Sequence, residues 1–454
     1  MDIIDPATGE ILGRLTADDE QGVREKAERA RAALPSWRGA SFAERAAIVG
    51  RFRSGIQTHL EALARTLSRE TGKPLTQSRG ELNALLTRID FFLEHTSEVL
   101  TEHVVHDGPG LREVVAREPL GTVACVSAWN YPYFVGGNVY LPALLTGNVV
   151  LYKPSELATL SGLRMEELWR EAGLPDGVFQ TVVGAGDVGR LLLDQPIAGA
   201  FFTGSFATGQ RIATQLAPRL IPLQLELGGK DPAYVTEDAP VETSAQSLVE
   251  GAFYNAGQSC CAVERIYVHR ERFDHFVEHF VEATRRLRMG APLDERTTLG
   301  PLARRDAQIE ALEAQVRDAT ARGARILTGG RRAERPGFFF EPTVLVDVDH
   351  SMDVMREESF GPVIGIQAVD GDDEALSLMG DTLYGLTAAV YTPNPDRARA
   401  LLSTLPVGSA YQNCCDRVSP RLPWSGRGHS GLGCTLSIDG IRALTVPKAW
   451  HLRS

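Results

Sequence analysis

The chain has 454 residues, which is enough for about three domains at roughly 150 residues each. Hydrophobic residues make up 43% of it and charged residues 23%, a balance typical of a soluble globular protein and not of a disordered one. The 47 Lys and Arg and the 58 Asp and Glu give a net charge of −11, so we expect no nucleic-acid partner and no membrane partner.

We expect no membrane-spanning segment and no secretory signal. The sequence has no run of about 18 apolar residues, and residues 1–6 lack the basic and apolar parts of a signal peptide. Its six cysteines are too few for a disulfide framework in so long a chain, and four of them form the adjacent pairs Cys260–Cys261 and Cys414–Cys415. We therefore expect a cytoplasmic enzyme with reduced thiols.

Residues 17–70 are predicted to be helical. Ser41 followed by Glu44 is the signature of a capping box. Apolar residues then recur at helical spacing, at Phe52, Ile56, Leu60, Leu63 and Leu67. Residues 71–74 (Thr-Gly-Lys-Pro) end this region, because glycine takes the left-handed cap and proline cannot continue a helix. A second long helix is predicted up to about Leu100.

Residues 104–120 predict an exposed pair of strands. A turn cluster at 106–110 (His-Asp-Gly-Pro-Gly) lies between short segments rich in valine, leucine and charged residues. We interpret this segment as an arm that reaches away from the body of the protein.

From residue 121 onward, short apolar runs alternate with helical segments such as 157–171. The predicted strands are Thr122–Ser127, Val149–Tyr152, Gln180–Val183, Ala200–Thr203 and Leu223–Leu227. This alternation predicts an α/β fold with a parallel sheet, whose ligands bind at the carboxyl ends of the strands. After Gly228–Gly229 a second α/β unit is predicted up to about residue 430, and the tail Ile441–Leu452 suits an edge strand because it contains Pro447.

Cys260 is a candidate nucleophile. It follows the small and polar residues 255–259, and Gly257 permits close backbone approach, so a ligand could reach the sulfur. Taken alone, an inert packing cysteine is the more common case, and a strained disulfide with Cys261 is a further alternative.

Glu226 is a candidate general base. It lies between two leucines at the end of a predicted buried strand, so partial desolvation should raise its pKa toward the useful range. Taken alone, a structural carboxylate in a salt bridge is the more common reading.

Two segments offer hydrogen-bond donors. Asn130 follows the strand at 122–127, and its amide could stabilise an oxyanion, although Asn before an aromatic residue and Pro is also an ordinary turn. The segment from Gly204 to Gly209 follows a strand and opens a helix, so its free amides would face a phosphate. Its spacing is not that of the usual dinucleotide fingerprint.

Together these segments resemble the aldehyde dehydrogenase superfamily, over essentially the whole chain and in the family's order. The motifs that carry the resemblance are Glu70–Pro74, Trp129–Pro132, Lys153–Glu156, Phe202–Ser205, Leu225–Lys230, Gly257–Cys260 and Glu358–Pro362. Seven motifs in order make the resemblance specific.

The resemblance implies a fold of three parts and a small-molecule partner. A variant Rossmann cofactor domain would comprise residues 1–100 and 120–228, an α/β catalytic domain residues 229–435, and a β oligomerisation arm residues 101–119 and 436–454. The protein would act on an aldehyde and would form a homodimer or a homotetramer.

The resemblance also implies a mechanism. Cys260 would attack the aldehyde as a thiolate, Asn130 and the backbone N–H of Cys260 would stabilise the oxyanion, and Glu226 would activate the water that hydrolyses the thioester. Lys153 belongs to this catalytic set and also to the cofactor site. The alternative is an acylating semialdehyde dehydrogenase that passes the thioester to coenzyme A or phosphate; Glu226 argues against it.

For the cofactor, the resemblance implies NAD in preference to NADP. A carboxylate near the adenosine ribose, here Glu156, accepts hydrogen bonds from free hydroxyls and repels a 2′-phosphate. Lys153 beside it partly offsets that repulsion. The full set of implied cofactor residues is Trp129, Lys153, Glu156, Gly204, Ser205, Gly209, Glu358 and Phe360.

The substrate is not determined by the sequence. The implied substrate contacts are Tyr131, Phe134, Ser259, Cys261 and Trp424, which suit a neutral aromatic or medium-chain aldehyde. The loop near Trp424 departs from the family pattern and is basic, with Arg417, Arg421 and Arg427. It is either a solvated loop or subunit contact, or a site where one arginine meets an anionic substrate tail.

Overall fold

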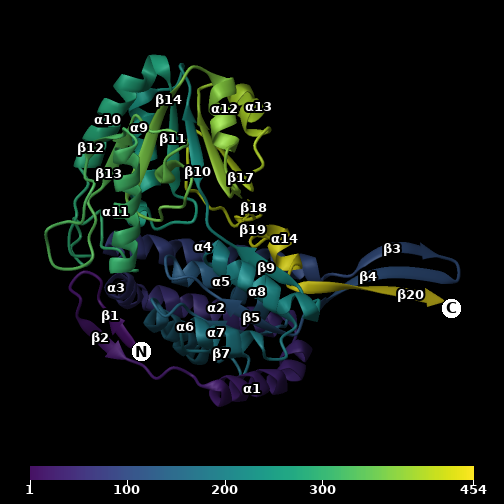
Figure 1. Cartoon of the computed structure of the whole chain (residues 1–454). Helices are drawn as coiled ribbons and strands as arrows, with labels where there is room; N and C mark the ends of the chain where they lie inside the picture. Colours follow the sequence, from purple (N-terminus) through teal and green to yellow (C-terminus); the bar gives the residue numbers. More distant parts are fainter. Residues whose placement is uncertain (454) are drawn as a thin grey trace.

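Two mainly parallel sheets, each covered by helices, form the body of the protein, and a three-stranded arm extends from it (Figure 1). The computed structural model describes residues 1–453. The α/β fold with a parallel sheet, predicted from the sequence, is confirmed.

The N-terminal region is helical, as predicted. Its elements are β1 (Asp2–Ile4), β2 (Ile11–Arg14), α1 (Glu20–Gly39), α2 (Phe42–Thr58), α3 (Leu60–Thr71) and α4 (Leu75–Leu100). The predicted capping box begins α2, with Ser41 and Glu44 each accepting a bond from the other's backbone N–H. Gly72 ends α3 at a positive φ of 83°, which only glycine adopts without strain. No helix within residues 1–453 combines the length and the hydrophobicity needed to cross a membrane.

The first sheet has the strand order β19-β9-β8-β5-β6-β7. Its strands are β5 (Thr122–Val126), β6 (Val149–Lys153), β7 (Phe179–Thr181), β8 (Gly199–Thr203), β9 (Leu223–Glu226) and β19 (Gly431–Leu432). Its helices are α5 (Pro132–Leu145), α6 (Thr159–Glu171), α7 (Gly186–Leu193) and α8 (Phe206–Leu216), followed by the short η1 (Ala217–Arg219). The five predicted strands are present and parallel, and the third ends two residues earlier than predicted.

The second sheet has the order β12-β13-β14-β11-β10-β16-β17. Its strands are β10 (Asp231–Val235), β11 (Val263–His269), β12 (Arg325–Thr328), β13 (Thr343–Val346), β14 (Val363–Val369), β16 (Thr387–Tyr391) and β17 (Ser409–Gln412). Its helices are α9 (Val241–Phe253), α10 (Phe273–Arg285), α11 (Asp306–Ala321), α12 (Asp372–Gly380) and α13 (Pro395–Leu402). The smaller elements are η2 (Tyr254–Gly257), η3 (Arg270–Arg272), η4 (Asp353–Met355), β15 (Tyr384–Gly385) and β18 (Arg427–Gly428).

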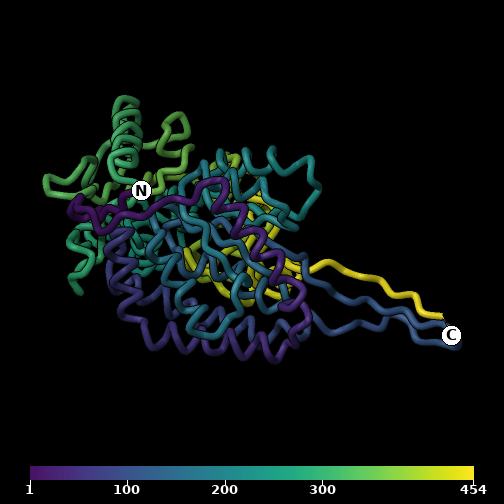
Figure 2. Tube along the Cα trace, turned by 90° about the horizontal axis from the view of Figure 1, so that it is seen from below, coloured from purple at the N-terminus to yellow at the C-terminus, as the bar shows by residue number. Residues whose placement is uncertain are grey.

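The arm is a three-stranded antiparallel sheet, β20-β4-β3, made of β3 (His103–Gly108), β4 (Leu111–Pro119) and β20 (Thr445–Arg453). The tail strand β20 lies at its edge, as Pro447 predicts, but it begins at Thr445 and not at the predicted Ile441, which belongs to a short helix. Figures 1 and 2 both show the arm projecting from the body, with the C-terminus at its tip.

The C-terminal part of the chain returns to the first unit before it enters the arm. Strand β19 pairs with β9, and helix α14 (Ser437–Arg442) packs against α4. Leu436 and Ile441 belong to the hydrophobic core of the first unit. Residues on both sides of the boundary proposed at residue 435 therefore pack against the first unit. The domain ranges remain a proposal.

A fully buried ion pair fixes α4 against α5. The Lys73 ammonium donates to the Glu81 carboxylate, and neither side chain is exposed to solvent. Glu81 also accepts the backbone N–H of Tyr133 at 2.8 Å, and the Lys73 ammonium lies 3.8 Å from the centre of the Tyr131 ring. The pair therefore determines where the loop after β5 and the start of α5 lie.

Removing one partner of this pair should strongly destabilise the protein. Glu81→Gln leaves the Lys73 charge buried without a counter-charge, which costs about 3–5 kcal/mol. Asp90→Asn is a matched control, because Asp90 pairs with Arg53 in an exposed ion pair worth below about 1 kcal/mol. Urea unfolding of both variants measures the difference, and equal midpoints would contradict the assigned role.

Candidate active site

The carboxyl ends of the first sheet meet the amino ends of the second. Glu226 and Lys153 are the last residues of β9 and β6, and Asn130 follows β5. Strand β10 begins only five residues after Glu226. Its neighbour in the second sheet is β11, and Cys260 lies just before β11. Four candidate residues far apart in the sequence are therefore carried to the junction of the two sheets.

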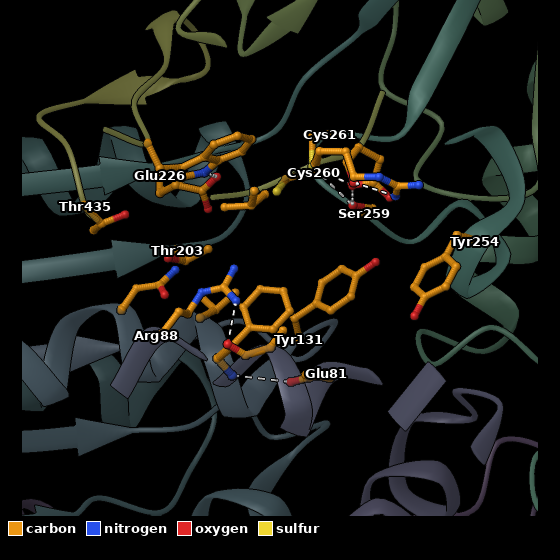
Figure 3. Close-up of a pocket in the computed structure, with 18 of the residues that line it drawn as sticks. Glu81, Arg88, Tyr131, Thr203, Glu226, Tyr254, Ser259, Cys260, Cys261 and Thr435 are labelled. Atoms are coloured by element: carbon orange, nitrogen blue, oxygen red, sulfur yellow. Dashed lines mark hydrogen bonds between the residues drawn. The ribbon is translucent and has the colours of Figure 1, made fainter. Parts of the chain in front are cut away.

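A cavity of about 240 Å³ lies at this junction (Figure 3). Seven residues predicted for catalysis or substrate binding line it: Tyr131, Phe134, Glu226, Ser259, Cys260, Cys261 and Trp424. The cavity is also lined by residues for which the sequence analysis gave no role, among them Arg88, Asn138, Tyr254, Asp416 and Thr435.

Glu226 is held beside the thiol of Cys260. The indole N–H of Trp424 donates to Glu226 Oε1 at 2.8 Å, and the carboxylate also lies within hydrogen-bond reach of Cys260. Burial raises the pKa of Glu226 to about 7, while the bonds to Trp424 and Cys260 act to lower it. The predicted rise in the pKa of this carboxylate is confirmed, and the group is suited to exchange protons near pH 7.

Cys260 is half-buried at the cavity wall and carries a free thiol. A hydrogen bond with Cys261 lowers the pKa of Cys260, but burial and the nearby negative charge of Glu226 raise it, to about 12. The sulfur is therefore protonated at pH 7, so the thiolate that the resemblance implies has to form by transfer of the proton to a nearby base. Burial and the carboxylate of a distant strand, neither of which the local sequence reveals, raise this pKa.

The adjacent Cys261 is turned toward a different partner. Its Sγ donates to Asp416 Oδ1 at 2.8 Å, and the Ser259 hydroxyl donates to the same oxygen at 3.4 Å. Both Cys260 and Cys261 are free, so the alternative of a disulfide between them is excluded in this structure. Of the two thiols, Cys260 is the one beside the base.

Asn130 lies against the turn that presents Cys260. Its side-chain amide donates to the Gln258 carbonyl at 3.2 Å, and the Asn255 amide donates to the backbone carbonyl of Asn130 at 3.3 Å. Asn255 and Ala256 both have a positive φ, which turns the backbone sharply before Cys260. Asn130 is buried behind the cavity wall, and the turn residue that it contacts lies two positions before Cys260.

The predicted cofactor residues at β6 and α8 have free binding capacity. Lys153 is buried, and its ammonium makes a single bond, to the Pro154 carbonyl at 3.2 Å; burial lowers its pKa. Ser205 precedes α8 without capping it, so the first amides of this 11-residue helix are available to a phosphate. These features fit the hydroxyl and phosphate groups of the dinucleotide that the resemblance implies.

The other predicted cofactor residues lie around the same junction. A Cβ at Gly204 or Gly209 would meet Phe202 or Leu227, so both glycines allow close packing. Glu358 accepts the Gly229 N–H at 3.1 Å, and burial raises its pKa to about 8.

The rings of Trp129 and Phe360 pack edge to face, with their centres 5.6 Å apart. Glu156 is exposed just beyond β6. None of the eight predicted cofactor residues, all of which fall in the described chain, lines the cavity that holds Cys260.

The three arginines of the basic loop occupy different places. Arg417 reaches the cavity and approaches Glu250 at 3.4 Å, with 59% of its side chain exposed. Arg421 and Arg427 are exposed and do not line the cavity. The sequence could have pointed to Arg88 instead, because it falls in the apolar stripe of α4 with Leu85 and Phe92.

The aldehyde dehydrogenase family model matches residues 1–450 of the chain. The 3,6-anhydro-alpha-L-galactose dehydrogenase of Streptomyces coelicolor is 36% identical over 90% of this chain and 84% of the relative. The NADP(+) succinate-semialdehyde dehydrogenase GabD of Escherichia coli is 33% identical over 97% of this chain and 92% of the relative. Betaine aldehyde dehydrogenase from Staphylococcus aureus, solved with NAD+, superposes with a TM-score of 0.96 at 30% identity, covering 100% of this chain and 91% of that one.

Replacing Trp424 by phenylalanine should raise the pKa of Glu226 above its value of about 7. The indole N–H stabilises the ionised carboxylate, and losing a charge-assisted bond corresponds to about one pH unit. A ¹³C NMR titration of the glutamate carboxyls, with Glu226→Gln used for assignment, measures the shift. Trp169→Phe is the matched control, since the Trp169 indole N–H has no partner among residues 1–453. An unchanged titration in Trp424→Phe would contradict the assigned bond.

Proposed function

The chain belongs to the aldehyde dehydrogenase family, and we propose that it oxidises an aldehyde to a carboxylic acid through a thioester on Cys260 that Glu226 helps to hydrolyse. The single observation that carries this proposal is the shared cavity in which the Cys260 thiol meets the Glu226 carboxylate. Both groups are buried enough to exchange a proton without competition from bulk water.

The first step is attack of the Cys260 sulfur on the aldehyde carbon. The thiol proton passes to Glu226, whose pKa of about 7 suits this transfer. The carbonyl oxygen becomes an oxyanion, for which the backbone N–H of Cys260 and the second amide N–H of Asn130 are the proposed donors. Each such donor contributes about 3–4 kcal/mol to the transition state.

The second half of the reaction releases the acid. A nicotinamide dinucleotide, when bound, supplies the acceptor for the hydride of the tetrahedral adduct. Glu226 first releases the thiol proton to solvent and then takes a proton from water. The hydroxide attacks the thioester carbonyl, the acid leaves, and Glu226 returns a proton to the departing Cys260 sulfur. Lys153 does not take part in these proton transfers; its ammonium would hold the ribose of the bound cofactor.

We propose NAD as the preferred cofactor. Glu156 is the carboxylate next to Lys153 and Ser155 beyond β6, where it would accept bonds from free ribose hydroxyls and repel a 2′-phosphate. Relatives of both kinds exist, since the Staphylococcus aureus structure holds NAD+ and the Escherichia coli relative is named for NADP(+). Glu156 is the residue that favours NAD here.

The acylating alternative would pass the thioester to coenzyme A or phosphate. Glu226 is retained, is buried, and has its pKa near 7. A base at that position serves attack by water, which favours hydrolysis over transfer to another acceptor.

We propose that the arm assembles the protein into a homodimer or a homotetramer. Its strands expose apolar side chains, including Val105, Trp450 and Leu452, which are 56%, 41% and 48% exposed. An exposed edge strand with apolar side chains is suited to contact another subunit.

A reducing compartment, the cytoplasm, is the proposed setting. All six cysteines are free, and a nucleophilic thiol needs protection from oxidation.

The proposal predicts reduction of NAD by aldehydes without any acyl acceptor. The purified protein is mixed with NAD or NADP and a panel of aldehydes, and the absorbance of the reduced cofactor is followed. We expect turnover with NAD, slower turnover with NADP, and loss of more than about a thousandfold in Cys260→Ala. Turnover that requires coenzyme A or phosphate would establish the acylating alternative, and full activity of Cys260→Ala would overturn the proposal.

A further inference from the structure

Arg88 is a buried cation in the wall of the substrate cavity. It lies on the inward face of α4 between Leu85 and Phe92 and is 3% exposed. Its side chain reaches the same cavity as Cys260, and in Figure 3 it lies across the cavity from Ser259 and Cys261. An arginine so deeply buried is rare unless its charge is paired.

Arg88 forms no ion pair within residues 1–453, and Glu81, which attracts its charge from farther away, is already paired with Lys73. Its Nη1 donates to the Ala84 carbonyl at 3.2 Å, while Nε is buried without a partner and no bond involves Nη2. Within the same residues, no carboxylate lies within 4.0 Å of the guanidinium. A buried charge left without a partner is costly, so the structure has an unsatisfied site for an anion.

The guanidinium is also held in a fixed orientation. It lies over the Phe134 ring, 4.1 Å from the ring centre, and the bond to Ala84 holds its other edge. The free Nε and Nη2 lie on one edge of the planar fork, which is the edge that binds a carboxylate with two parallel bonds.

The four acidic residues that line the cavity have other partners, beginning with Glu226, which accepts from the Trp424 indole. Glu81 is bonded to Lys73 and to the Tyr133 N–H, and Asp416 accepts from Cys261 and Ser259. Glu250 faces Arg417 at the exposed rim. The anion that satisfies Arg88 therefore has to come from outside the chain.

We propose that Arg88 binds a carboxylate at the far end of the substrate, so that the substrate class is a semialdehyde acid, with the aldehyde at Cys260 and the carboxylate on Nε and Nη2 of Arg88. This inference rests on the proposed function for the aldehyde end. In this proposal the anionic tail of the substrate binds Arg88 of α4 and not the basic-loop arginines Arg417, Arg421 and Arg427.

The test compares aldehydes that differ only at the far end. The substrates are 4-oxobutanoate and 5-oxopentanoate against butanal and pentanal, with 4-aminobutanal as the cationic analogue, each assayed for kcat/KM with NAD. We expect the wild-type protein to prefer the carboxylated aldehydes, and Arg88→Met to reduce that preference about a hundredfold, mainly through KM. Arg88→Lys, which keeps the charge but loses the planar fork, should recover only part of it.

Arg421→Met is the matched control, since Arg421 is exposed and outside the cavity. Its preference should equal that of the wild type. If Arg88→Met lowered kcat/KM equally for carboxylated and neutral aldehydes, the proposal would be overturned. A wild-type preference for 4-aminobutanal that disappears in Asp416→Asn would overturn it in favour of a cationic substrate.

A binding measurement separates this inference from the proposed function. Succinate and glutarate are titrated calorimetrically into the wild-type protein and into Arg88→Met and Arg88→Lys, with butyrate as the monocarboxylate control. Binding of the dicarboxylates that weakens at least tenfold in both variants supports the site, even if no aldehyde were oxidised. Binding that is equal in the wild type and both variants would overturn it, even if aldehydes were oxidised.

Discussion

Burial of a carboxylate beside a thiol is the constraint on which the site depends. Glu226 has a pKa of about 7 because β9 ends inside the protein, and the same negative charge helps to raise the pKa of Cys260 to about 12. With these two pKa values, the proton shared by Cys260 and Glu226 lies on the sulfur before the substrate binds. It moves to Glu226 only when the two side chains are in direct contact. The Trp424 indole keeps this arrangement, because its bond at 2.8 Å stabilises the ionised form of Glu226 without exposing it to water.

Two buried ion pairs hold the walls of the site. Lys73 and Glu81 fix the start of α5, and with it the aromatic side of the substrate cavity. On the other side, Lys230 pairs with Glu264 at 2.7 Å, and Glu264 also accepts the backbone N–H groups of Ser359 and Phe360. The segment that carries Glu358 is thereby tied to β10 and β11. Each pair has extra hydrogen bonds, which is the condition under which a buried pair supports a unique geometry.

Local pattern was sufficient to predict much of the fold. The alternation of apolar runs and helical segments predicted the five parallel strands of the first sheet, and Pro447, which cannot donate a backbone hydrogen bond, placed the tail at the edge of the arm. The raised pKa of Glu226 could be predicted from local sequence, because a carboxylate between two leucines at the end of a buried strand is desolvated. By contrast, the short strand β19 and its pairing with β9 depend on contact across about 200 residues and leave no local signal.

The electrostatics of the site needed the tertiary structure. The protonation of Cys260 depends on charges from β9 and from the loop that carries Asp416, and no segment alone contains that information. The basic loop drew attention to Arg417, Arg421 and Arg427 because they lie close together in sequence, yet only Arg417 reaches the cavity. Arg88 was overlooked since a single arginine in a helix usually lies at the surface.

The most direct test of the central claim is to trap the covalent intermediate and find the residue that carries it. Glu226→Gln protein is mixed with NAD and an oxidisable aldehyde, quenched in acid, digested, and mapped by tandem mass spectrometry that separates Cys260 from Cys261. The account predicts an acyl group on the Cys260 sulfur alone. It forms slowly, because the thiol has lost the base that takes its proton, and it accumulates, because the thioester is not hydrolysed. An acyl group on Cys261, or rapid turnover with no adduct, would contradict it.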